Sequence, residues 1–217
     1  MSDKTRPGVQ QTSSDDRHAD DDPRVQQSMR AMREALNTLL GERAFNDITV
    51  QQILDRAGVS RATFYAHFRN KDDVLFASFE RMVHGLARTL NTPHERQRPR
   101  LVPMRELIEH FASAGDVFHS LESSGRMEAL WDFGTDVLAG LIEDRLPTFR
   151  AVFARRRAPT PLDDGMDDRL TARMLAGACL ELVKWSRAFP DRLTPAELDA
   201  RFHVMAQRAV APAIFQA

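Results

Sequence analysis

The sequence predicts an all-α protein in which an N-terminal three-helix unit is joined by a long fourth helix to a helical C-terminal region. Three observations predict this class. Apolar residues recur at helical spacing over most of the 217 residues, capping signals precede several of these stretches, and no stretch shows the alternation of a half-buried strand. Residues 49–72 also contain two short helical stretches around a tight turn, which is the pattern of a helix-turn-helix.

Residues 1–23 are expected to form a disordered acidic tail. They contain three Lys and Arg residues, six Asp residues and almost nothing apolar, so they cannot bury enough surface to offset the entropy of ordering. A metal site in the run DDRHADDDP is the alternative, but nothing there fixes a ligand geometry. We therefore expect no metal site.

The first helix is expected from about Arg24 to Gly41, where the glycine ends it. Phe45 and Ile48 should fill the space between this helix and the next pair. The buried stripe of the helix is predicted to consist of Met29, Met32, Leu36, Leu39 and Leu40.

The next two helices are delimited by capping residues. Thr49 and Gln52 have the spacing of a capping box, and Gly58 supplies the left-handed residue that ends the first of the two helices. Ser60 caps the second helix, expected over Arg61–Phe68. The first helix of the pair has its apolar face at Val50, Ile53, Leu54 and Ala57.

The second of these helices has two distinct faces. Phe64 and Phe68 fall on one face, and Ala62 and Ala66 fall roughly opposite. Buried rings with alanines outward would let the helix backbone approach a flat partner such as the major groove of DNA. The alternative is an ordinary amphipathic helix whose alanines face water. The flanking side chains could contact base edges or phosphates; they are Arg61, Thr63, Tyr65 and His67.

The rest of the chain also reads as helices. Asn70 caps a fourth helix that should continue to about Leu90, and a linker rich in proline follows over Asn91–Pro103. Further helices are expected over about 104–121, 127–153 and 167–188, with breaks near Gly115, residues 123–125 and Pro147, and a loop over 155–164. A last helix is capped by Thr194 in a second capping box.

Residues 24 to about 90 resemble the N-terminal domain of the tetracycline-repressor (TetR) family of bacterial transcription regulators. The run FY-x-HF-x-x-K after AGVS is specific to that family. The resemblance implies a helix-turn-helix domain over 24–72, with its linking helix to about 90, followed by a ligand-binding and dimerisation domain over 91–217. The residues that match are Phe45, Thr49, Ile53, Ala57, Gly58, Val59, Ser60, Thr63, Phe64, Tyr65, His67, Phe68, Lys71 and Leu75.

The resemblance implies a double-stranded DNA operator as partner. Lys71 corresponds to a lysine that contacts the DNA backbone in the family, and the alternative is an exposed surface lysine. The charge distribution fits: residues 24–90 carry ten Lys and Arg against seven Asp and Glu, an excess of three. The expected DNA-binding residues are Thr49, Ser60, Arg61, Ala62, Thr63, Tyr65, Ala66, His67 and Lys71.

In the family, the C-terminal domain forms a homodimer and often encloses a small, apolar or amphipathic effector. The alternative to an effector pocket is a plain packed core, which would show the same pattern of apolar residues. The alternative to a dimer helix is a helix buried within its own chain, which would also show the same pattern. The candidate ligand-binding residues are His110, Phe111, Phe118, Glu122, Met127, Trp131 and Leu138. The candidate dimer residues, on the last two helices, are Met174, Ala178, Leu182, Trp185, Phe202, Met205 and Ala209.

The sequence thus predicts a DNA-binding transcriptional regulator, a ligand-responsive repressor that acts as a homodimer on a palindromic operator. The alternatives are a helix-turn-helix protein that senses no ligand, or an activator. An enzyme is disfavoured because no H-x-x-x-H spacing, phosphate loop or nucleophile elbow occurs. We expect no cofactor, no membrane span and a cytoplasmic protein, associated with the nucleoid when bound to DNA. The single cysteine, Cys179, should be a buried structural thiol.

Overall fold

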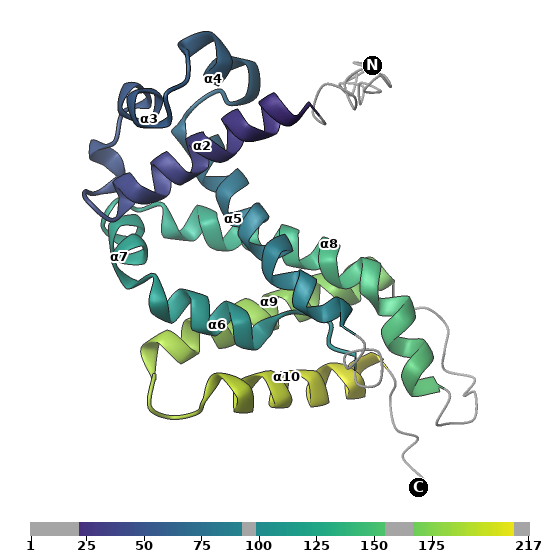
Figure 1. Cartoon of the computed structure of the whole chain (residues 1–217). Coiled ribbons are helices and arrows are strands. Elements are labelled where there is room, and N and C mark those ends of the chain that lie inside the picture. Colours follow the sequence, from purple (N-terminus) through teal and green to yellow (C-terminus); the bar gives the residue numbers. More distant parts are fainter. Residues whose placement is uncertain (1–21, 93–98, 155–166, 211–217) are drawn as a thin grey trace, which may run out of the picture.

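The computed structural model describes residues 22–92, 99–154 and 167–210, and this part of the chain is helical, without strands (Figure 1). The N-terminal elements are α2 (Pro23–Leu40), η1 (Phe45–Asp47), α3 (Val50–Ala57) and α4 (Arg61–His67). They are followed by α5 (Lys71–Ala87), η2 (Arg88–Asn91), α6 (Met104–Ser113), α7 (Gly115–Ser123), α8 (Met127–Ala154), α9 (Asp168–Ala188) and α10 (Pro195–Val210). The predicted all-α class is confirmed.

The helices are arranged in two groups joined by α5. In Figure 1, α2, α3 and α4 lie together at the top, and α5 descends from them toward the C-terminal helices. There α8 packs along α9, and α10 packs beside α6. The helix α7 contacts α2, so the C-terminal group also touches the N-terminal group away from α5.

The N-terminal helices begin and end close to the predicted residues. The helix α2 starts at Pro23, one residue early, because the Asp22 side chain accepts a hydrogen bond from the Arg24 amide at 2.9 Å and proline suits the first helical position. Phe45 is 0% and Ile48 1% exposed, so both fill the junction with the next pair as expected. The predicted tail, apart from its last two residues, lies outside the described residues.

Two expectations for the later elements need correction. The fourth helix ends as an α-helix at Ala87, and its last turn to Asn91 is the 3₁₀-helix η2. The break near Gly115 occurs, but the expected break at Pro147 is wrong, since α8 continues through this proline. Leu146 and Phe149 on either side are 0% and 1% exposed, and their burial outweighs the one backbone hydrogen bond that proline removes.

The segment expected to be a linker over 91–103 ends inside the protein. Leu101 and Val102 are both 0% exposed. The Leu101 amide donates to Nε2 of His203 on α10 at 3.1 Å, and Nδ1 of the same ring lies 2.8 Å from the Asp199 carbonyl oxygen. Residues 99–103 therefore pack as part of the C-terminal core, whereas residues 93–98 lie outside the described part of the chain.

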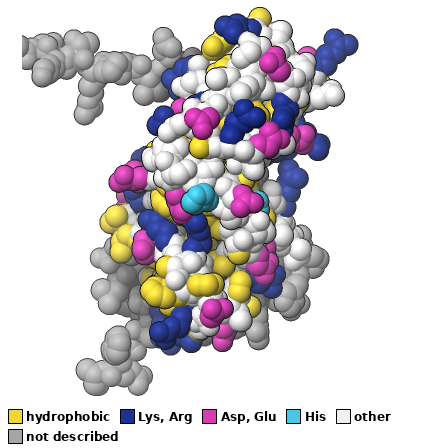
Figure 2. Space-filling view, turned by 90° about the vertical axis from the view of Figure 1, so that its left-hand side faces the viewer, with side chains coloured by type: hydrophobic (Ala, Val, Ile, Leu, Met, Phe, Trp, Pro, Cys, Tyr) yellow, Lys and Arg dark blue, Asp and Glu magenta, His cyan; other side chains and the backbone are white. Residues whose placement is uncertain are grey.

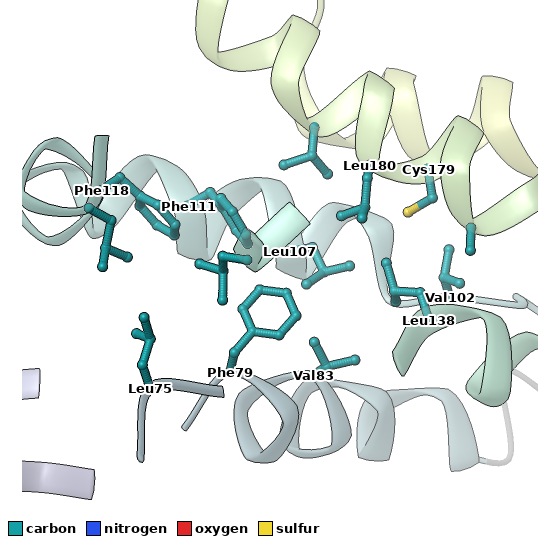
Figure 3. Packing of buried hydrophobic residues seen from close by; sticks show 14 of the residues in the cluster. Leu75, Phe79, Val83, Val102, Leu107, Phe111, Phe118, Leu138, Cys179 and Leu180 are labelled. Atoms are coloured by element: carbon teal, nitrogen blue, oxygen red, sulfur yellow. The ribbon is translucent and has the colours of Figure 1, made fainter. Parts of the chain in front are cut away.

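The hydrophobic core is continuous from α2 to α10. Figure 3 shows its centre, where Phe79 of α5 faces Leu107 and Phe111 of α6, and Leu180 of α9 closes the far side. Cys179 is 0% exposed there, and burial raises the pKa of its thiol to about 12. The domain limits expected from the sequence stay a prediction, because no gap in the core marks them.

The outer surface differs between the two groups of helices. On the face seen in Figure 2, hydrophobic side chains are more frequent over the lower half, where the C-terminal helices lie, than over the upper half. Among the described helices, none has both the length and the hydropathy to cross a membrane.

Candidate nucleic-acid interface

The helix-turn-helix consists of α3, a three-residue turn and α4. The Thr49 hydroxyl accepts from the Gln52 amide at 3.2 Å, and the Gln52 side chain accepts from the Thr49 amide at 2.9 Å, which completes the predicted capping box. Gly58 ends α3 with φ 66° and ψ 32°, a left-handed conformation that favours glycine. The Val59 amide then donates to the Leu54 carbonyl at 3.2 Å, so the direction of the turn is fixed by the backbone.

The start of α4 is fixed by Ser60 and Thr63. The Ser60 hydroxyl accepts from the Thr63 amide at 3.1 Å, and the two hydroxyl oxygens lie 2.8 Å apart. Ser60 therefore serves as the cap that the sequence predicts. The Ser60 and Thr63 hydroxyl groups pair with each other. Ser60 is nevertheless exposed to solvent at the start of α4.

The two faces of α4 are arranged as the spacing predicts. Phe64 is 0% and Phe68 4% exposed, with their ring centroids 5.9 Å apart in the core. Ala62 and Ala66 are exposed on the other side. Tyr65 is 52% exposed, and its ring meets that of Phe64 edge-on with centroids 5.3 Å apart. The outer face of α4 thus offers small side chains beside a phenol.

Arg61 has a partner that the sequence did not indicate. Its Nη2 donates to Oε1 of Gln51 at 2.8 Å, and Nε2 of Gln51 donates to Oδ1 of Asp55 at 2.8 Å. Gln51 and Asp55 lie four residues apart on α3, so they face the same side of that helix. The carboxylate orients the amide, and the amide oxygen orients the guanidinium. The i, i+4 spacing of Gln51 and Asp55 could have predicted their contact from the sequence. The contact of Gln51 with Arg61 could not be predicted in this way, because it depends on the angle between α3 and α4.

Lys71 is partly buried against the connection between α2 and α3. Its ammonium donates to the carbonyl oxygens of Phe45 at 2.6 Å, Asn46 at 3.3 Å and Ile48 at 2.6 Å. It also lies 4.5 Å from the centroid of the Phe45 ring. Desolvation by these groups lowers the pKa of Lys71. The three donors of the ammonium are directed at three carbonyl groups, so a phosphate contact would require it to leave one of them.

The junction between the two groups of helices lies beside Lys71. The Ser120 hydroxyl of α7 donates to the Arg43 carbonyl at 3.0 Å. Nε of Arg126 lies 3.1 Å from Oδ1 of Asp72, and the guanidinium lies 5.8 Å from the Phe45 ring centroid. The connection between α2 and α3 is therefore held both by α5 and by the segment that joins α7 to α8.

The seven candidate ligand-binding residues do not surround one cavity. Phe111 stacks on Phe118 with centroids 4.3 Å apart and on Trp131 at 5.3 Å, so these rings fill one another's space. His110 and Phe118 line a cavity of about 120 Å³ between α2, α5, α6, α7 and α8, and desolvation lowers the pKa of His110.

The other candidates lie elsewhere. Glu122 and Trp131 line a separate hollow of about 290 Å³ with Lys184 and Arg187. The Glu122 carboxylate accepts from Arg187 at 2.8 Å, so its charge is compensated there. Leu138, 0% exposed, and Met127, 9% exposed, belong to the core. The shared pocket expected from the sequence stays a prediction.

The candidate dimer residues lie mostly on the outer surface of α9 and α10. Met174 is 60% and Met205 42% exposed, Ala209 is exposed, and Ala178, Leu182 and Trp185 are half-buried. Phe202 is only 1% exposed and packs inside its own chain, so it is unsuited to a contact surface. Two further exposed apolar residues lie on these helices, Leu170 at 52% and Val204 at 49%, and sequence reasoning missed the second of them.

The N-terminal part of the chain resembles known regulators. Residues 33–77 match the family model of bacterial regulatory proteins of the tetR family. The HTH-type transcriptional regulator BetI of Brucella canis is 33% identical over 84 residues, which cover 34% of this chain and 42% of BetI. BetI of Brucella suis is 36% identical over 74 residues, 31% of this chain and 37% of that protein. The match thus spans less than half of these relatives.

Solved structures resemble the chain over most of its length. A TetR transcriptional regulator from Streptococcus agalactiae has a TM-score of 0.51 at 22% identity, covering 87% of this chain and 98% of that one. The dihydroxyacetone kinase operon activator DhaS has a TM-score of 0.54 at 16% identity, covering 84% and 96%. At these identities the likeness shows the fold, including that of the C-terminal helices.

Proposed function

We propose that this chain, whose N-terminal domain is that of the tetR family of bacterial regulatory proteins, is a sequence-specific transcriptional regulator that binds a DNA operator through α4. One observation carries this proposal: α4 is anchored by buried Phe64 and Phe68 and turns Ala62 and Ala66 to the solvent. An α-helix with small outward side chains can lie deep in a major groove. Arg61, held by Gln51, stands at the edge of this face.

The roles of the surrounding residues follow from their positions. Arg61, Tyr65 and His67 would contact bases or phosphates, and the hydroxyl of exposed Thr49, at the start of α3, would approach the backbone. Thr63 and Ser60 would contribute mainly through the cap that fixes the helix start, with their outer surfaces against the sugar-phosphate chain. Lys71 would act inside the domain, through the carbonyl groups of residues 45, 46 and 48.

We further propose that the functional species is a homodimer on a palindromic operator. A single recognition helix reads only a few base pairs, and a two-fold dimer reads two half-sites one helical turn or a multiple apart. The outer face of α9 and α10 supports this assembly, because Leu170, Met174, Val204 and Met205 are each more than two-fifths exposed. Four large apolar side chains on two neighbouring helices suit burial against a second copy.

An effector would act on the cavity that borders both groups of helices. Its wall includes Leu40 of α2, Leu75 and Phe79 of α5, and Phe118 of α7, with His110 as a polar group. At about 120 Å³ it is smaller than the roughly 300–1,000 Å³ of ordinary ligand sites, so a small apolar or amphipathic ligand would have to push α5 away from α6 and α7. Such a shift would move α4 and lower operator affinity, as in a repressor released by its effector.

Selection of bound fragments from genomic DNA tests the proposal. The purified chain should enrich a palindrome, and a band-shift titration with that palindrome should give a homodimer bound to one site. Arg61→Ala and Tyr65→Ala should each weaken binding to the recovered operator without lowering the melting temperature. If no fragment is enriched even at low ionic strength, where non-specific DNA binding is strongest, the proposal is wrong.

A further inference from the structure

A groove between α2 and α5 contains two arginines without an acidic partner. It has a volume of about 810 Å³ and lies away from α3 and α4. Arg33 on α2 and Arg81 on α5 both line it, and within the described residues neither side chain makes a hydrogen bond or an ion pair. The other lining residues are Pro23, Gln26, Gln27, Arg30, Glu34, Asn37, Ser78 and Met82.

The two guanidinium groups repel each other across the groove. Arg33 is half-buried, and desolvation together with the charge of Arg81 lowers its pKa. The charge of Glu34 offsets this lowering only in part, because the Glu34 carboxylate pairs with Arg30, whose Nε lies 2.6 Å from Oε1 of Glu34. Two like charges on facing helices, one of them partly desolvated, are stabilised when an anion binds between them.

We propose that Arg33 and Arg81 form a binding site for a small oxyanion, a carboxylate or a phosphate, between α2 and α5. Guanidinium groups match such anions because their planar N–H donors can pair with two oxygens at once. The side-chain amides of Gln27 and Asn37 line the same groove and can donate further hydrogen bonds. The volume falls within the range of small-molecule sites. This site is distinct from the cavity proposed for the effector, although Asn37, Ser78 and Met82 border both.

The position of the groove gives the anion a mechanical role. The helix α2 supports the helix-turn-helix, and α5 connects it to the C-terminal helices. An anion held by one arginine from each helix would favour their present packing over any arrangement that separates them. It would therefore raise the stability of the folded chain by RT ln(1 + c/Kd), where c is the free anion concentration.

Titration of the full chain with inorganic phosphate, and separately with citrate, tests the site. Calorimetry and thermal unfolding should be done at constant ionic strength, with chloride as the balancing anion. We expect saturable binding with a rise in melting temperature. Arg33→Gln and Arg81→Gln should each weaken binding at least about tenfold, since each removes a charge-assisted contact. Arg30→Gln is the matched control: it lines the same groove but already pairs with Glu34, so its effect should be clearly smaller.

A second experiment tests whether the anion at this site comes from free solution or from the aspartates of the N-terminal tail. Residues 1–21 contain five Asp, and Pro23, two residues further on, lines the groove. If a variant that begins at residue 22 binds phosphate more tightly than the full chain, the tail's carboxylates occupy the site. If the two bind equally, the site takes free anions.

Two outcomes overturn the proposal. One is the absence of saturable binding in both the full and the shortened chain. The other is binding that Arg33→Gln and Arg81→Gln leave unchanged. Because no DNA is needed, these results are independent of the operator. If the two variants instead lower the salt dependence of DNA binding and no free anion binds, the arginines contact the duplex backbone and the anion site is rejected.

Discussion

Gly134 on α8 lies directly against the ring of Phe79 on α5. A Cβ atom at position 134 would come within 3.0 Å of Cζ and 3.1 Å of Cε1 of that ring. The ring cannot easily yield, because it packs edge-on against Phe111 and Phe133, with centroids 6.4 Å and 6.3 Å away. The absence of a side chain at residue 134 thus sets how closely the linking helix approaches the C-terminal helices.

Gly134→Ala is therefore expected to destabilise the chain although alanine favours helices. Overpacking of a tight core costs about 1–3 kcal/mol, which exceeds the roughly 0.5–1 kcal/mol gained from alanine in a helix. Gly140→Ala, in the same helix and with nothing within 4 Å of its Cβ position, is the matched control and should stabilise. Urea unfolding of both variants measures the difference. Equal stabilisation by the two changes would show that Phe79 moves freely.

Lys71→Ala should lower the stability of the N-terminal domain and leave the salt dependence of DNA binding unchanged. The ammonium donates to three carbonyl groups, and its hydrogen bonds to the Phe45 and Ile48 carbonyls are partly buried. Loss of hydrogen bonds to a charged donor costs about 1–3 kcal/mol. The measurements are urea unfolding and the slope of log affinity against log salt. If the lysine contacts a phosphate instead, as the sequence resemblance implies, the slope should fall by about one unit.

Gln51→Ala should weaken operator binding by about two- to tenfold, because a free Arg61 must be ordered on binding, at about 0.5–1.5 kcal/mol. The loss should be specific to the operator and leave the salt dependence unchanged. A double-mutant cycle with Arg61→Ala checks the cause: the effect of Gln51→Ala should vanish when Arg61 is absent. An effect that persists, with a shallower salt slope, would mean that Gln51 itself contacts the DNA.

The stability of the chain should fall as the pH drops below about 6.5. The pKa of His110 in the folded chain is depressed from 6.5, so the unfolded chain binds more protons in the interval between the two values. The contribution of His110 to stability is fully present above its pKa in the unfolded chain. This contribution is lost as the pH falls through its pKa in the folded chain. His110→Gln should flatten this dependence in thermal unfolding from pH 5 to 8. An unchanged profile would assign the pH dependence to other groups.

Met174→Glu should convert the proposed homodimer into a monomer with an intact fold. Met174 is 60% exposed on α9, so a carboxylate is well solvated in the monomer but would be desolvated in an interface of two copies. Sedimentation velocity gives the oligomeric state, and circular dichroism gives the helix content. Operator binding should weaken with loss of the dimer. A variant that remains dimeric would place the interface elsewhere.

Local signals in the sequence were sufficient to predict the helix-turn-helix. Thr49, Gly58 and Ser60 define their turns through contacts within four residues, and Phe64 is buried because of helical periodicity. The use of Lys71 as an internal donor could not be predicted in this way. Its three partners lie 23–26 residues earlier in the chain. A lysine at the start of a helix has the same local sequence pattern whether it faces solvent or donates to such distant carbonyl groups.

The sequence could not place the C-terminal candidates relative to one another for a related reason. A stripe of large apolar residues predicts burial, but it does not distinguish a filled core from a lined cavity. Phe111, Phe118 and Trp131 stack on one another, which depends on the angle between α6, α7 and α8. Pro147 was expected to break α8, because local propensity does not include the burial of Leu146 and Phe149 beside it.

The burial of Cys179 makes this protein convenient for distance measurements. It is the sole cysteine of the chain and is 0% exposed, with a thiol pKa of about 12, so it should resist maleimide and spin-label reagents while the chain is folded. A cysteine introduced at exposed Ala66 would then be the reactive thiol of each protomer. Two labels in an assembled pair would report the separation of the two α4 helices directly, with and without an added ligand.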